Sequence, residues 1–175
     1  MTLTRRTVLT GLLLSPALAV GLSANDEALL SLEVVLFAQA GAKPSSPKVP
    51  PLELPDFSQS LARVERKTQG LALLGAAHAL ARQGYETLGH HLWWLRTPAN
   101  ARIGVKHEDN KTQLACQLQR GQTLTLDFKA WLRQDSVSGV SINEQRRVKF
   151  TETHYFDHPQ WGALVQVRNH QGDES

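Results

Sequence analysis

The sequence predicts an α+β fold in which an antiparallel β-sheet carries one long helix packed on a face. A short run of β-branched and aromatic residues at 32–37 predicts a first strand. Apolar residues recur at helical spacing over residues 58–83, which predicts the helix. Between residues 85 and 167 apolar and polar residues alternate and turn residues intervene, which predicts five or six strands joined by short turns.

The length and composition fit one globular domain that has no disulfide. The chain has 175 residues, of which 41% are hydrophobic, and one cysteine. This composition excludes a disordered chain and a polytopic membrane protein. A single cysteine excludes an internal disulfide and a thiolate cluster for zinc or iron–sulfur. Because Cys116 alternates with Leu114 and Leu118, it is predicted to be a buried core thiol.

Residues 1–24 have the pattern of a signal peptide. Arg5 and Arg6 precede a short apolar run, and small residues follow at Ala19 and Ala24. The run is shorter than the ~20 apolar residues that span a bilayer, and Pro16 lies within it. The segment predicts export to the periplasm, and its paired arginines loosely resemble a twin-arginine signal. An uncleaved inner-membrane anchor is the alternative interpretation.

The net charge of the protein depends on this segment. The whole chain has 19 Lys and Arg against 16 Asp and Glu, a net charge of +3. Arg5 and Arg6 are the only charged residues in 1–24, so the remaining chain has 17 basic and 16 acidic residues, a net charge of +1. Global charge therefore selects no acidic polymer, and no nucleic-acid partner is predicted.

Residues 25–175 are predicted to form a single domain. The proline-rich segment 40–55 is expected to be a mobile loop, because proline cannot donate to a β-ladder. Asp56 or Ser58 is expected to cap the helix that follows, and Gly84 to end it in the left-handed conformation. Residues 85–96 have apolar side chains on both alternations, which predicts a central strand with two covered faces that ends at Pro98.

Several kinds of catalytic or metal site lack support in the sequence. His90 and His91 are adjacent in a predicted strand and therefore point to opposite faces. His154 and His158 have a spacing that converges only on a helix, and Pro159 follows at once. The chain has no G-x-S-x-G elbow, glycine-rich phosphate loop or defined carboxylate pair. The sequence thus predicts neither enzyme nor cofactor, with an exported cell-wall hydrolase and a periplasmic metal-binding protein as the alternatives.

A basic and aromatic region near the C-terminus is the main candidate for a binding surface. Basic residues at 146–149 precede aromatic residues at 155–161. Aromatic faces stack on sugar rings, and arginines pair with carboxylates. The alternative interpretation is structural: the aromatics pack into the core, and Asp157 caps a rigid turn. The candidate ligand-binding residues are Arg146, Arg147, His154, Tyr155, Asp157, His158 and Trp161.

Three stretches of the chain, in order, share patterns with one known family. They are residues 32–39 (LEVVLFAQ), 84–94 (GYETLGHHLWW) and 143–167, which contain the core HYFDHPQWG. These stretches resemble the CsiV family, periplasmic peptidoglycan-binding proteins of Gram-negative bacteria. The resemblance implies a non-catalytic protein that binds peptidoglycan and supports cell-wall biogenesis and cell shape. Its implied partner is an outer-membrane lipoprotein that activates a penicillin-binding protein, and the resemblance assigns no binding residues.

Overall fold

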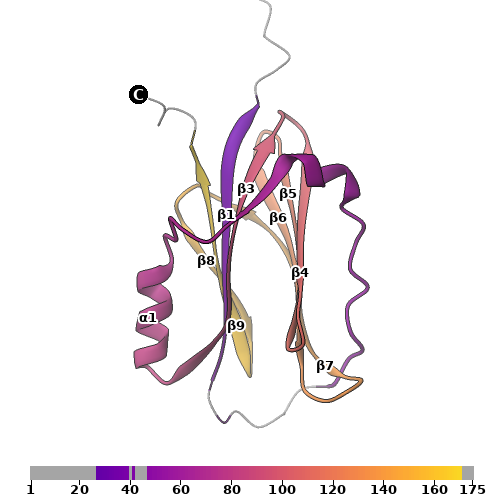
Figure 1. Ribbon diagram of the computed structural model, residues 1–175, viewed down its shortest axis with the longest axis vertical. Helices are drawn as coiled ribbons and strands as arrows, with labels where there is room; N and C mark the ends of the chain where they lie inside the picture. The colour runs from indigo at the N-terminus through magenta and orange to yellow at the C-terminus, as the bar shows by residue number, and fades with distance from the viewer. Residues whose placement is uncertain (1–26, 40, 42–46, 171–175) are drawn as a thin grey trace, which may run out of the picture.

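The computed structural model describes residues 27–39, 41 and 47–170 (Figure 1). Two antiparallel sheets pack face to face. The first has the strand order β2-β3-β1-β9-β8 and the second the order β4-β5-β6-β7. The elements are β1 (Ala28–Gln39), η1 (Ser58–Arg63), β2 (Val64–Lys67), α1 (Leu74–Arg82), β3 (Tyr85–Thr97), β4 (Arg102–Glu108), β5 (Thr112–Arg120), β6 (Leu124–Arg133), β7 (Gly139–Val148), β8 (Thr153–His158) and β9 (Trp161–Asn169).

The main core lies between the two sheets. Alternate residues of β1, such as Leu32 and Val34, point inward and meet Phe128 of β6 and Phe156 of β8. The rings of Phe128 and Phe156 are 4.4 Å apart between centroids. Cys116 belongs to this core and is fully buried, which confirms its prediction as a core thiol, and burial raises the pKa of its thiol.

The prediction of one long helix over residues 58–83 is wrong. The segment divides into the 3₁₀ turn η1, the edge strand β2 and the nine-residue helix α1. Val64 to Lys67 pair with β3, so their backbone groups are satisfied by the sheet rather than by a helix. Helical spacing in the sequence could not reveal this competing strand partner.

The ends predicted for this helical segment are confirmed in part. The N–H of Ser58 donates to the Asp56 carboxylate at 2.9 Å, so Asp56 caps the start of η1. The chain leaves α1 at Gly84 with a φ of +86°, the left-handed conformation expected there. The helix packs on the outer face of the first sheet, as Figure 1 shows, where Leu73 and Ala77 cover Val35 and Phe37.

The predicted strands are present, but there are more of them and they form two sheets rather than one. Residues 32–37 lie within β1, and residues 85–96 lie within β3. The prediction that β3 is a central strand is confirmed, because β3 lies between β2 and β1 and ends directly before Pro98. Seven strands follow α1 in the described chain, where five or six were predicted. The α+β expectation thus becomes a mostly antiparallel β fold with one short helix.

The proline-rich segment is bound to the second sheet over the part that the structure describes. Val49 and Gly139 exchange backbone hydrogen bonds of 2.8 and 2.9 Å. The indole of Trp131 donates to the Val49 carbonyl at 3.3 Å, and the N–H of Leu52 donates to Gln113 at 2.8 Å. Residues 47–55 thus form a loop, as predicted, that is anchored at Val49 and Leu52. This segment runs along the outside of the second sheet in Figure 1.

The predicted signal peptide, residues 1–24, lies outside the described residues. Within the described part of the chain, α1 is too short to cross a membrane, and no other helix there is long and apolar enough to do so.

Candidate functional site

A small pocket lies on the outer face of the first sheet, where the end of β1, the start of β3 and β8 come together. Its volume is about 260 Å³. Four of its nine lining residues are aromatic, a carboxylate and an imidazole lie among them, and the surface that lines the pocket is mostly polar. The lining residues are Phe37, Gln39, Tyr85, Tyr155, Asp157, His158, Pro159, Gln160 and Trp161. We refer to this site as the aromatic pocket.

The aromatic wall is organised around Phe37 of β1. Tyr155 stacks on Phe37 with 6.0 Å between ring centroids and an angle of 13°, and Tyr85 meets Phe37 edge-on at 5.5 Å. The backbone at Gly162 makes room for this stack, because a Cβ there would lie 2.9 Å from the Tyr155 ring and 3.0 Å from Phe37. Tyr155 remains 48% exposed. Its ring therefore offers apolar surface to a ligand on a fixed support.

The polar groups of the pocket have defined hydrogen-bonding states. The Tyr155 hydroxyl donates to the Asp157 carboxylate at 2.8 Å. Burial, this hydrogen bond and the charge of Asp157 raise the pKa of Tyr155 to about 12, so the phenol stays protonated. Burial lowers the pKa of His158, which is therefore neutral at neutral pH, and its Nδ1 accepts the N–H of Gln160 at 3.3 Å. The pocket thus combines one carboxylate and one neutral imidazole with aromatic faces.

The structure brings together four of the seven residues proposed from the sequence. Tyr155, Asp157, His158 and Trp161 all line the aromatic pocket. Trp161 is only 3% exposed and belongs to the main core, so it supports the pocket more than it presents a surface. Its placement agrees with the structural interpretation of the aromatics.

The other three proposed residues lie elsewhere. Arg146 crosses the edge of the sandwich: its guanidinium lies 4.1 Å over the Phe156 ring, donates to the Tyr155 carbonyl at 2.9 Å and pairs with Glu144. His154 accepts the backbone N–H of Lys149 at 3.2 Å. Arg147 is exposed and follows Arg146 in β7, so it points to the opposite face. These side chains do not share one site.

Five pocket residues were not among the sequence candidates, namely Phe37, Gln39, Tyr85, Pro159 and Gln160. Each lies in one of the stretches that resemble the CsiV family. Their convergence depends on β1 pairing with both β3 and β9, which places Gln39 opposite Tyr85 and Phe37 opposite Gly162. Alternation within one strand carries no information on these pairings.

The histidines are distributed as the strand geometry requires. His90 Nε2 lies 2.6 Å from Glu33 on the side of α1, while the ring of His91 lies 4.1 Å from that of His107 in β4. The prediction that His90 and His91 face opposite ways is confirmed. Among residues 27–39, 41 and 47–170, no group of three or more His, Cys, Asp or Glu side chains is arranged to hold a metal ion.

The fold and the pocket define a small antiparallel β-sandwich with a shallow aromatic site on one outer face. The family model described as "Peptidoglycan-binding protein, CsiV" matches residues 79–170, more than half of the chain. The protein belongs to this family, which confirms the resemblance seen in the sequence. The match includes Tyr85 and the pocket residues of β8, and it leaves out Phe37 and Gln39. No curated protein and no solved structure matched the chain.

Proposed function

We propose that this protein binds peptidoglycan, without catalysing a reaction on it, through the aromatic pocket. The observation that carries the proposal is the family match over residues 79–170. The chemistry of the pocket supports it. Sugar rings present C–H faces that stack on aromatic side chains, and their hydroxyl groups donate to a carboxylate and accept from the N–H of a neutral imidazole. Tyr155, Asp157 and His158 supply these three kinds of group together.

The small size of the aromatic pocket favours binding of one part of a polymer at the protein surface. Enclosed small-molecule sites typically measure roughly 300–1,000 Å³. A volume of about 260 Å³ is smaller, so it suits one ring of a glycan strand whose remainder lies across the surface. The half-exposed ring of Tyr155 fits this mode of binding.

The proposal includes a place and a role in the cell. The signal-like segment 1–24 supports export to the periplasm. There the protein would support cell-wall synthesis by assisting an outer-membrane lipoprotein that activates a penicillin-binding protein, the role that the family resemblance implies. Crosslinking in living cells, followed by identification of the captured lipoprotein, tests this role. Capture of only cytoplasmic proteins would contradict it.

Pull-down of the purified protein with peptidoglycan sacculi tests the binding proposal. We expect enrichment over an unrelated protein of the same net charge. Replacing Tyr155→Ala should reduce binding about tenfold, since aromatic contact area dominates such sites. The matched control is Val137→Ala, which shortens a side chain that is 73% exposed and is not part of the pocket. Absence of wild-type enrichment, or equal binding by Y155A, would overturn the proposal.

A further inference from the structure

A second concave region lies at the far end of β1 and β3 from the aromatic pocket. Gln39 and Tyr85 line the aromatic pocket, whereas Leu29 and Arg96, at the opposite ends of the same two strands, line this region. The strand between Tyr85 and Arg96 spans roughly 35 Å at the usual rise per residue. The two sites are therefore separate, and one polymer can reach both.

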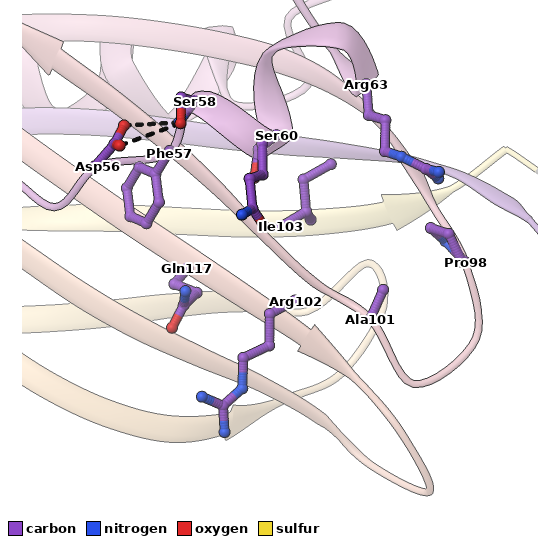
Figure 2. Close-up of a pocket in the computed structure, with 11 residues that line it drawn as sticks. Asp56, Phe57, Ser58, Ser60, Arg63, Pro98, Ala101, Arg102, Ile103 and Gln117 are labelled. Carbon is purple, nitrogen blue, oxygen red and sulfur yellow. Dashed lines mark hydrogen bonds between the residues drawn. The ribbon is translucent and has the colours of Figure 1, made fainter.

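Two cavities of about 420 and 320 Å³ make up this region and share Arg63 as a common wall. The larger one lies between the 56–63 segment and the second sheet, and Figure 2 shows Arg63 on one side of it and Arg102 with Gln117 on another. The smaller one contains Arg96 and Trp94. We call the two cavities together the Arg groove.

The arginines of the Arg groove differ in how far they are already paired. Arg63 donates to Glu27 at 2.8 Å. Arg102 donates only through Nε, to Gln119 at 3.1 Å, in the contacts found among the described residues, which leaves its two terminal nitrogens for a ligand. Arg96 is exposed. The Arg102 guanidinium thus lines the larger cavity, which is large enough for a small ligand, and Arg96 lines the smaller one.

Two acidic side chains, Asp56 and Glu65, also line the groove, and both are hydrogen-bonded. The Asp56 carboxylate accepts both the N–H and the hydroxyl of Ser58, at 2.9 and 3.1 Å, and these bonds lower its pKa. Glu65 pairs with Lys67. Asp56 stays ionised, but the basic lining residues Arg63, Lys67, Arg96 and Arg102 outnumber the acidic ones, so the groove has a net positive charge. In the aromatic pocket, by contrast, Asp157 is the charged lining residue and His158 is neutral.

We propose that the Arg groove binds the carboxylates of peptidoglycan stem peptides, while the aromatic pocket takes the sugar. This inference rests on the proposed function. The planar guanidinium matches a carboxylate with two parallel hydrogen bonds, and such charge-assisted bonds are stronger than neutral ones. The walls of the larger cavity, which include Phe57 and Gln117, supply apolar surface and an amide for a peptide backbone.

The test compares intact sacculi with sacculi from which an amidase has removed the stem peptides. Arg102→Gln and Arg96→Gln should each lower binding to intact sacculi about threefold to tenfold, and the loss should shrink at high salt. Neither substitution should change binding to the stripped glycan. The matched control is Arg82→Gln, which removes an exposed arginine at the end of α1.

Equal losses on intact and stripped material, or no loss on either, would overturn the inference and leave the proposed function standing. Titration with a soluble stem peptide, followed by NMR, separates the two proposals. If the wild-type protein binds this peptide and R102Q does not, the Arg groove is supported even where sacculi are not bound. If the wild-type protein does not bind the peptide, the inference fails.

Discussion

Between β3 and β9 the chain crosses from one sheet to the other twice, and the side chains at the two crossings have different chemistry. The first runs from β3 to β4 through residues 98–101, and the second from β7 to β8 through residues 149–152. Each crossing contains a residue other than glycine with a positive φ, Asn100 at +58° and Thr151 at +64°. The backbone conformation of the two crossings is therefore similar, but the side chains that connect the two sheets there differ.

The second crossing is closed by apolar and permanently charged groups. Phe156 stacks on Phe128. The Arg146 guanidinium lies over the Phe156 ring at a distance of 4.1 Å. Arginine keeps its charge at all physiological pH values. These two ring contacts therefore do not depend on pH in mild acid.

The first crossing depends on a neutral imidazole. His91 of β3 is 4% exposed, and its ring lies 4.1 Å from the tilted ring of His107 of β4, while Arg66 donates to its Nδ1 at 3.1 Å. Its Nε2 has no hydrogen-bond partner among the described residues. Burial, His107 and Arg66 lower the pKa of His91 to about 4. The contrast teaches that the buried ring contacts of one edge include a titratable imidazole, whereas those of the other are apolar or permanently charged.

The largest effect is expected at the second crossing. Phe156→Ala removes a fully buried ring and should lower the free energy of unfolding by about 3–5 kcal/mol. Tyr155→Ala, one residue away on the outer face and 48% exposed, should cost no more than about 1–2 kcal/mol. Urea denaturation of both variants measures the difference. Equal costs would show that β8 does not present these rings to opposite faces.

A smaller, pH-dependent effect is expected at the first crossing. His91 titrates near 6.5 in the unfolded chain and at about 4 in the folded protein, so between these values the unfolded chain binds more protons. Stability should therefore fall as the pH drops from about 6.5 to about 4. Each unit of pKa difference is worth about 1.4 kcal/mol, so the loss approaches about 3 kcal/mol. Urea denaturation at a series of pH values measures it.

The groups around His91 set the control for this prediction. Arg66 and His107 face the ring, and His107 is itself held by Asp109 at 3.2 Å. His91→Gln removes the titration of this side chain and should flatten the stability profile between pH 6.5 and 4. Phe156→Ala should shift the same profile downward and keep its slope. A slope unchanged in H91Q would assign the acid sensitivity to other groups.

Local sequence patterns were sufficient for the parts of the fold that depend on one strand. The alternation in residues 85–96, the αL end at Gly84 and the burial of Cys116 were all predicted correctly. The long helix failed because residues 64–67 have a strand partner in β3, which periodicity along the chain cannot show. Local pattern fixes an element most reliably when no distant partner competes for its backbone.

The candidate site was predictable only in part for the same reason. Tyr155, Asp157 and His158 belong to one contiguous sequence motif, and all three line the aromatic pocket. Phe37 lies in the pocket only because β1 pairs with β9. Arg146 lies outside the pocket, because its side chain packs over the Phe156 ring. Sequence proximity therefore identified the strand, and sheet pairing decided which side chains share the pocket.

The smallest change in stability is expected from exchanging the residue types at the two positions with positive φ, Asn100 and Thr151. Asparagine tolerates the left-handed conformation, while a β-branched residue there is strained. Thr151→Asn should therefore stabilise the protein by about 0.5–1 kcal/mol, and Asn100→Thr should destabilise it by about 1 kcal/mol. The gain at Thr151 is reduced by loss of the bond from its hydroxyl to the Phe150 carbonyl, at 2.6 Å. Thermal unfolding measures both changes, and shifts of the same sign would show that backbone strain does not distinguish the two crossings.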